Sequence, residues 1–150
     1  MRIVIQRVSE ASVCIEGKLV GQIEEGLLVL LGIAQNDTAA DANYLIQKLI
    51  NLRIFSDAEG KMNLSVQAIN GELLIVSQFT LHAATKKGNR PSYIKAARPE
   101  VAIPLYEAFL DELHKQFTGK IQTGQFGADM KVSLVNDGPV TIILDSEVEI

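Results

Sequence analysis

The chain has 150 residues, 47% of them apolar, and this size and composition are typical of a single globular domain. A net charge of −4 argues against indiscriminate binding of nucleic acid, and a single cysteine excludes an internal disulfide framework. No apolar stretch approaches the roughly 20 residues that span a bilayer, and Gln6 and Arg7 interrupt any signal-peptide core. We therefore expect a cytoplasmic protein without a membrane partner.

β-strands are predicted through the first part of the chain. Residues 3–8, 11–15 and 19–23 form short β-type runs, and Glu16-Gly17-Lys18 is a hairpin turn between the last two. Residues 26–33 are continuously apolar, which indicates a central strand covered on both faces.

A helix should follow, and either Asn36 or Asp37 can cap its start. The apolar residues there recur at the spacing of one buried helical face, at Ala42, Leu45, Ile46, Leu49 and Ile50. A strand that begins at Glu72 and ends near Thr80 comes next, after the turn signal Asn70-Gly71.

A second helix is predicted over residues 101–117, where Pro104 fits only in the first turn. Strands near residues 120–125, 130–135 and 140–144 complete the chain. The order of elements predicts an α/β fold, a single domain with mixed β-sheets and two main helices packed in layers. The apolar face of the second helix comprises Ala102, Leu105, Tyr106, Phe109, Leu110, Leu113 and Phe117.

Ser77-Gln78-Phe79-Thr80-Leu81 is the first segment with functional character. It places hydroxyl and amide groups at the far end of a buried strand, and polar groups at such a position are a common way to build a site on a rigid element. A strand whose polar end is simply solvated would show the same pattern.

Asn136-Asp137-Gly138-Pro139-Val140-Thr141 is the second such segment, set between two apolar β-type runs. Proline cannot donate a ladder hydrogen bond, and a bond that precedes proline is the common location of a cis peptide. Such a unit can hold two backbone carbonyls in one direction. An ordinary hairpin turn is the alternative interpretation, and the sequence does not decide the isomer.

Residues 86–98 contain five of the chain's 14 Lys and Arg residues and none of its 18 Asp and Glu residues. A basic loop on an acidic protein can attract one phosphate-rich element while the rest of the surface repels the polymer. Lys86, Lys87 and Arg90 are therefore candidates for contact with a nucleic acid, although a loop of this kind can also be merely solvated.

Other chemistries lack support in the sequence. His82, His114 and one cysteine do not form a zinc site of familiar spacing, and no glycine-rich phosphate-binding motif is present. His82 would share a face with Thr80 if the strand continued, but we expect it to be merely exposed. His114 falls opposite the apolar face of its helix, so solvent should surround it.

The segments 77–81 and 136–141 together closely resemble the signature pair of the D-aminoacyl-tRNA deacylases, the D-tyrosyl-tRNA(Tyr) deacylase family. The opening residues 1–8, the loop 87–93 and residues 123–130 look like the same family, in the same order and spacing. The resemblance therefore covers essentially the whole chain and implies a single deacylase domain over residues 1–150. Tyr93 stands where phenylalanine is common, which is a mild departure.

The resemblance implies hydrolysis of the ester that joins a D-amino acid to the terminal adenosine of tRNA, without a cofactor or metal and without a DNA partner. An aminoacyl ester is already reactive, so the enzyme needs orientation and oxyanion stabilisation more than a strong nucleophile. Backbone N–H groups of Phe79 and Thr80 are candidates for holding the carbonyl oxygen. Thr80 either attacks the ester or, as we prefer, positions the attacking water. The catalytic residues implied are Ser77, Gln78, Phe79 and Thr80.

The resemblance also implies chiral selection by a cis Gly138-Pro139 unit inserted into the partner subunit's site, and hence a homodimer. Its carbonyls would hold the substrate's α-amino group and leave no volume for an L side chain, so glycyl-tRNA should be cleaved as well. Arg7 is expected to brace this unit through a backbone carbonyl, or else to be a surface arginine. Phe126 and Met130 are the other substrate-binding residues implied.

Two further classes of function stay open. One is a non-catalytic tRNA-binding module that uses the basic loop. The other is a different small esterase or amidase that uses Thr80 and His82. Cleavage of D-tyrosyl-tRNA, L-tyrosyl-tRNA and a generic ester would separate the three.

Overall fold

A long first strand, β1 (Arg2–Ile15), organises the sheet because three other strands pair with it. β2 (Lys18–Ile23) pairs antiparallel with the second half of β1, and β3 (Gly26–Gly32) pairs antiparallel with its first half. The prediction of two strands, 3–8 and 11–15, is wrong, because the exposed positions between them belong to one continuous strand. The computed structural model describes residues 1–150.

The other side of β3 continues the sheet with two parallel strands. β6 (Glu72–Ser77) pairs with β3, and β7 (Ile121–Thr123) pairs with β6. The last strand, β8 (Lys131–Asp145), returns antiparallel along β1. The sheet is therefore mixed and has six strands, and the predicted α/β fold class is confirmed.

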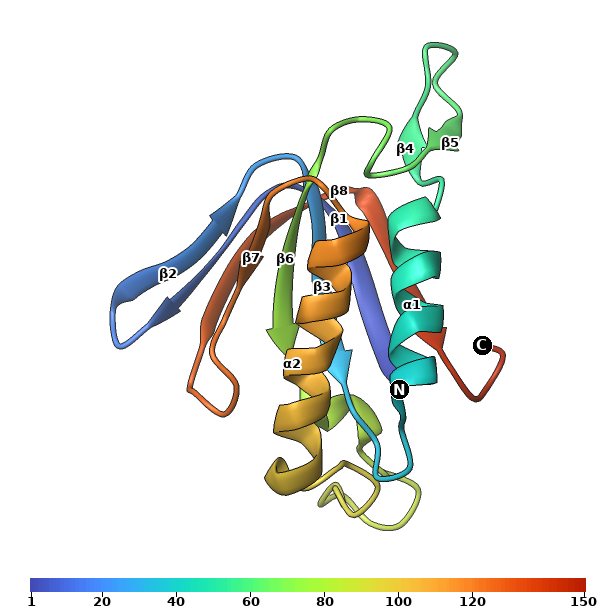
Figure 1. The fold of residues 1–150 in the computed structure, drawn as a ribbon. Coiled ribbons are helices and arrows are strands. Elements are labelled where there is room, and N and C mark those ends of the chain that lie inside the picture. Colours follow the sequence, from blue (N-terminus) through green and yellow to red (C-terminus); the bar gives the residue numbers. More distant parts are fainter.

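The small hairpin of β4 (Phe55–Ser56) and β5 (Met62–Leu64) was not predicted. Strands of two and three residues are too short to show an alternating pattern of apolar and polar residues. In Figure 1 this hairpin projects from the upper end of the molecule, beyond the first helix.

The first helix, α1 (Ala39–Asn51), buries the five predicted apolar residues. Thr38 caps it, and the Thr38 N–H donates to Asp41 Oδ2 at 2.8 Å. The prediction of Asn36 or Asp37 as the cap is wrong. Asp37 is otherwise engaged, because its carboxylate accepts from the Ala34 N–H and pairs with the buried Met1 ammonium.

The second helix, α2 (Pro99–Gln116), begins two residues earlier than predicted. Pro99 occupies the start, where the fixed φ of proline suits the first turn and its missing N–H has no cost. Pro104 therefore lies inside the helix and not in the first turn, which corrects the second part of that prediction. The predicted apolar face is largely buried, with Leu105 and Leu110 partly so.

Both helices lie on one face of the sheet (Figure 1), and the main core of 22 buried residues fills the space between them and the strands. A second cluster of seven buried residues lies apart from it. It comprises Val8, Ala11, Val13, Ile23, Leu28, Leu74 and Val76, with Leu30, Met130, Val132 and Leu134 partly buried against them. No helical residue belongs to this second cluster, so its outer side is a sheet face without a helical layer. Neither helix has the length and apolar composition that crossing a membrane requires.

Candidate active site

The buried strand β6 ends at Ser77, and a short 3-10 helix, η1 (Phe79–His82), follows it directly. The prediction that the strand continues to Thr80 is therefore wrong, and Thr80 and His82 do not share a strand face. Gly32 at the end of β3 permits the close approach of this turn, because a Cβ there would lie 3.0 Å from the Gln78 carbonyl oxygen.

A cavity of about 260 Å³ opens at this strand end. Ser77, Gln78 and Phe79 line one part of it, and Phe126 and Met130 line another part from the segment between β7 and β8. The structure therefore brings these five candidates together. Sequence reasoning missed the rest of the lining, which comprises Leu31, Ile33, Val76, Ala97, Ala102, Gly127, Ala128, Asp129 and Val132.

Thr80 does not line the cavity itself but is tied to a residue that does. The Gln78 side-chain amide, through Nε2, donates to Thr80 Oγ1 at 2.6 Å. The Thr80 hydroxyl proton is consequently free to be donated to another group. Arg2 holds the far side of the turn, because its Nη1 donates to the Leu81 carbonyl oxygen at 3.1 Å.

His82 is half-buried, and its Nε2 is fully buried without a hydrogen-bond partner in the protein. The expectation of an exposed histidine is therefore wrong. The ring packs closely against Gly32, where a Cβ would lie 3.1 Å from His82 Cδ2. His114 is exposed, as expected.

Behind the cavity wall, Tyr106 of α2 packs on Phe126, with 5.6 Å between the ring centroids. Burial raises the pKa of Tyr106 to about 12, so the phenol is neutral at physiological pH. The chain brings together no group of three His, Cys, Asp or Glu side chains that could hold a metal ion. Ten of the 14 lining residues are hydrophobic, so the cavity is mostly apolar.

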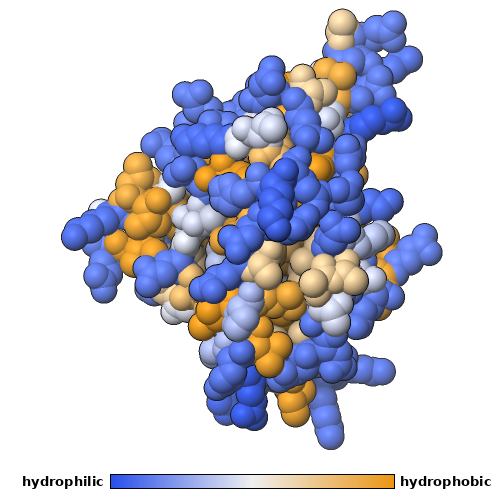
Figure 2. Space-filling model, viewed as in Figure 1, coloured by the Kyte–Doolittle hydropathy of each residue, from blue (hydrophilic) through white to orange (hydrophobic).

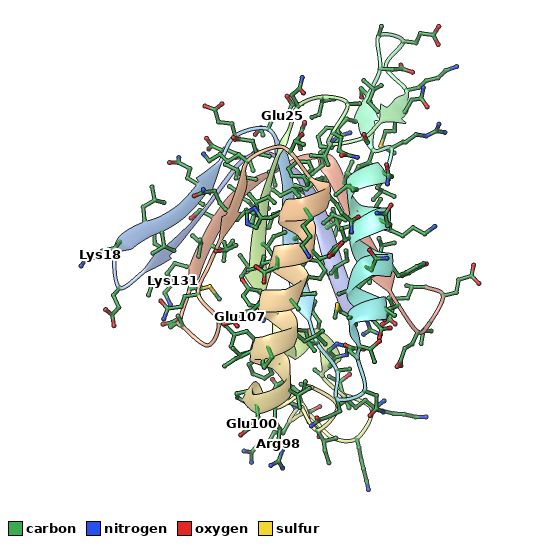
Figure 3. All side chains as sticks on the ribbon, viewed as in Figure 1. Lys18, Glu25, Arg98, Glu100, Glu107 and Lys131 are labelled. Atoms are coloured by element: carbon green, nitrogen blue, oxygen red, sulfur yellow. The ribbon has the colours of Figure 1, made fainter.

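The basic loop, residues 86–98, borders the same cavity through Ala97. Lys86, Lys87 and Arg90 are exposed in a turn that a pair of backbone hydrogen bonds closes between Ala84 and Ser92. Figure 3 shows Arg98 at the lower end of the molecule, where α2 begins, far from the labelled Glu25 at the upper end.

The Gly138–Pro139 step forms a bulge inside β8 and not a hairpin turn between two strands. Gln6 of β1 pairs with Thr141 and Val8 pairs with Asn136, so four residues of β8 stand opposite one residue of β1. The Gly138–Pro139 peptide bond is cis. Both residues are exposed.

Two side chains fix the base of the bulge. Asn136 Nδ2 donates to the Arg7 carbonyl oxygen at 2.9 Å and to the Val140 carbonyl oxygen at 3.0 Å. Sequence reasoning gave this asparagine no role of its own, although an Asn directly before a turn is a signal for such bonds.

Arg7 reaches the bulge from β1 and is largely buried. Its Nε donates to the Asp137 carbonyl oxygen at 3.1 Å, and its Nη1 donates to the Ile54 carbonyl oxygen at 2.7 Å. Gly138 has a φ of +127°, and a Cβ there would lie 2.9 Å from Arg7 Nη2. Glycine is therefore required by both conformation and space.

Within the chain, the bulge and the cavity lie at opposite ends of the central strands, the bulge near the start of β6 and the cavity at its end. The direction of β6 can be followed in Figure 1. Arg7 pairs with Leu27, which pairs with Leu73 near the start of β6, whereas the cavity lies at Ser77. Four residues of strand correspond to about 13 Å along the sheet. The structure thus does not bring Gly138, Pro139 and Arg7 to the cavity of the same chain.

A preformed cavity on a rigid strand end, with a few convergent polar groups, is typical of a small α/β enzyme. Comparison with known proteins identifies the family. The family model described as D-Tyr-tRNA(Tyr) deacylase matches residues 4–145. The chain belongs to this family.

Relatives named D-aminoacyl-tRNA deacylase match nearly the full length of the chain. The protein of Flavobacterium psychrophilum is 63% identical, with 98% of each chain covered. The proteins of Akkermansia muciniphila and Thermosipho melanesiensis are 60% and 56% identical, with 97% and 98% of each chain covered.

Two solved structures share the fold. One, described as c-Myc DNA Unwinding Element Binding Protein, has a TM-score of 0.94 and 43% sequence identity, with 99% of this chain and 100% of that chain covered. The other, a probable eukaryotic D-amino acid tRNA deacylase, has a TM-score of 0.82 at 17% identity, with 96% and 98% covered.

Proposed function

We propose that this protein hydrolyses the ester bond between a D-amino acid and the terminal adenosine of tRNA, and so removes D-amino acids before they enter translation in the cytoplasm. As a member of its family the chain is a hydrolase that acts on aminoacyl-tRNA esters. The observation that carries the proposal is one cavity at the end of β6 where Ser77, Gln78, Phe79, Phe126 and Met130 meet beside a basic loop.

The chemistry needs little from the protein, because the ester is already activated. Water adds to the carbonyl carbon and the bond between that carbon and the ribose oxygen breaks. The ribose oxygen takes up the proton that the water gives up and leaves as a hydroxyl. The N–H groups of Phe79 and Thr80 lie in the first turn of η1, where they have no acceptor within that helix. We assign them to the developing oxyanion, since donors fixed in advance stabilise it most.

Thr80 acts in this scheme by positioning, with its hydroxyl oriented by Gln78. Thr80→Ala should lower kcat for D-tyrosyl-tRNA about 100-fold, which is the lower end of the range that a positioned acid–base group contributes. Thr80→Ser should retain most of the rate. Near-complete loss in Thr80→Ala, with tRNA binding intact, would instead indicate a threonine nucleophile.

The basic loop supplies the contact with tRNA. Lys86, Lys87 and Arg90 are exposed in the loop that borders the cavity through Ala97, and they would attract phosphates of the acceptor end. Neutralising all three with glutamine should raise KM for aminoacyl-tRNA and flatten its salt dependence, while kcat changes little. A kcat effect without a KM effect would contradict this assignment.

Chiral selection is assigned to Gly138 and Pro139 of a partner subunit in a homodimer. The bulge is exposed and braced by Arg7 and Asn136, yet it lies far from the cavity of its own chain. The sheet face over the second apolar cluster has no helical layer and offers a surface for a second copy. A rigid backbone that excludes an L side chain would still admit glycine, so glycyl-tRNA is the expected second substrate.

Mixing two impaired variants, each with little activity of its own, tests action across the dimer. Thr80→Ala damages the cavity, and Gly138→Ala damages the bulge. If each site needs both subunits, a mixture re-equilibrated after mild dissociation should regain about a quarter of the wild-type activity, because half of the dimers then hold one intact site. A mixture that regains nothing, or an active monomer, would contradict the proposal.

The alternatives predict other outcomes in one assay. An RNA-binding module would retain D-tyrosyl-tRNA without cleaving it, whereas another small esterase would cleave a generic ester and L-tyrosyl-tRNA equally well. The wild-type protein should instead release D-tyrosine and spare the L form. Because one relative is described as a DNA-element binding protein, duplex DNA should be included as a competitor, and we expect no inhibition at physiological salt.

A further inference from the structure

Two aromatic side chains lie exposed where the cavity meets the basic loop. Phe79 is 54% exposed and Tyr93 is 42% exposed, although large apolar rings are usually buried. Their ring centroids are 5.1 Å apart with the planes at 75°, an edge-to-face arrangement. Phe79 also lines the cavity, so the pair extends the cavity wall to the surface.

We propose that Phe79 and Tyr93 form a stacking platform for the unpaired base that precedes the terminal adenosine of the substrate. This inference rests on the proposed function and adds a specific RNA contact to it. Single-stranded nucleic acid is held where exposed aromatic rings accompany a positively charged groove. Here the side chain of Phe79 serves the base, independently of the backbone N–H assigned to the ester.

The platform is held in place before any ligand arrives. Ala84 and Ser92 exchange two backbone hydrogen bonds of 2.8 and 2.9 Å directly before Tyr93. The Tyr93 carbonyl oxygen accepts from the Ala96 N–H at 3.0 Å, directly after it. A fixed ring loses little entropy on stacking, which favours a recognition role over a solvated loop.

Charge selects RNA over a protein partner. Tyr93 of the platform lies within residues 86–98, which carry five cations and no anion. A second copy of this surface would bring the same charges and repel it, whereas the phosphates that flank an unpaired base would complement it. Figure 2 shows hydrophobic residues among hydrophilic ones at the lower end of the molecule, where this loop lies.

The experiment compares substrates that contain or lack the base. Steady-state cleavage of D-tyrosyl-tRNA, of the same tRNA with an abasic penultimate nucleotide, and of D-tyrosyl-adenosine is measured for the wild type, Tyr93→Ala and Tyr93→Phe. Ile94→Ala is the matched control, because Ile94 is 80% exposed in the same loop and carries no ring.

Tyr93→Ala should raise KM for D-tyrosyl-tRNA roughly 5- to 100-fold, the range expected for one stacked base. Tyr93→Phe and Ile94→Ala should stay within about twofold of the wild type, since the ring makes the contact. The abasic substrate should show the same rise in KM with the wild type and no further rise with Tyr93→Ala. Cleavage of D-tyrosyl-adenosine should not respond to any of these variants.

Other results would overturn the platform. If Tyr93→Ala impaired cleavage of D-tyrosyl-adenosine as much as cleavage of the tRNA, Tyr93 would only support the cavity. If Tyr93→Ala raised KM for the abasic tRNA further, the missing base would have been bound elsewhere. Should Tyr93→Ala fail to fold, the wild type with the abasic substrate decides alone, and an unchanged KM there refutes the inference. If the wild type cleaves none of the esters, the proposed function itself fails, which is a distinguishable result.

Discussion

The cavity at the end of β6 and the Gly138–Pro139 bulge of β8 are built in opposite ways. The cavity is a hollow assembled from several chain segments, and the bulge is a projection from β8 alone. Each is tied to β1 by an arginine, Arg2 through the Leu81 carbonyl oxygen and Arg7 through the Asp137 carbonyl oxygen, both at 3.1 Å. β1 thus anchors a cavity and a projecting bulge that lie too far apart to meet within the chain, which is the geometry that the proposed dimer requires.

Breaking the bulge should have the largest effect. Gly138→Ala would place a Cβ 2.9 Å from Arg7 Nη2 and 3.0 Å from Val140 Cγ2, at a φ that L residues rarely adopt. We expect kcat/KM for D-tyrosyl-tRNA to fall 100-fold or more, since displacements near 1 Å cost about that much. Gly60→Ala is the control, because its φ of +78° is also positive but its Cβ would meet nothing within 4 Å. Equal activities of the two variants would remove the bulge from the site.

The two arginines should separate the regions by the kind of defect. Lysine cannot span two carbonyl oxygens as the Arg7 guanidinium does, so Arg7→Lys should reduce the preference for D- over L-tyrosyl-tRNA about tenfold. Arg2→Lys loosens the turn after β6 and should lower kcat about tenfold while the preference stays unchanged. Both substrates are measured for both variants. If Arg7→Lys and Arg2→Lys showed the same defect, the two arginines would not support separate functions.

The same comparison explains what could be predicted from the sequence. Alternating and continuously apolar runs predicted the mixed sheet, and helical spacing predicted both buried helix faces, because these patterns record burial directly. The motif Ser77-Gln78-Phe79 was placed correctly at a strand end, since the side chains change there from apolar to polar.

Other features depend on contacts between distant residues, which no local pattern records. His82 is covered because Gly32, fifty positions away, lets the turn close against β3. Asp37 fails to cap α1 because the Met1 ammonium occupies it. The bulge resembles a hairpin in sequence, and only the register with β1 distinguishes the two.

Acid should weaken the support that Asp145 gives to the turn beside the cavity through Arg2. Burial opposes ionisation of Asp145, but bonds from the Glu147 and Val148 N–H groups and from Arg2 outweigh it and lower its pKa below the usual 3.8. The folded state therefore binds fewer protons, and this stabilisation is present above about pH 3.8 and lost as pH falls through the lower folded pKa. Asp145→Asn should cost about 1–2 kcal/mol of the free energy of unfolding at pH 7.

Chemical denaturation between pH 3 and 7 measures this difference. The gap between the wild type and Asp145→Asn should shrink toward the acid end, while the exposed control Asp111→Asn should match the wild type throughout. A gap that is independent of pH would mean that the charge of Asp145 contributes nothing.

The smallest effect is expected behind the cavity wall, where the Tyr106 hydroxyl is buried and no protein group pairs with it. Tyr106→Phe keeps the ring against Phe126 and removes an unpaired polar atom, so the free energy of unfolding should rise by up to about 1 kcal/mol. The pKa of about 12 in the folded state, against 10.0 unfolded, means that the wild type loses stability from pH 10 upward as the unfolded phenol ionises. Denaturation at pH 8 and 11 should therefore show a widening advantage of Tyr106→Phe, whereas the exposed Tyr44→Phe should show none. A destabilised Tyr106→Phe would mean that the hydroxyl is paired, and that the packing behind the apolar cavity wall includes a polar contact.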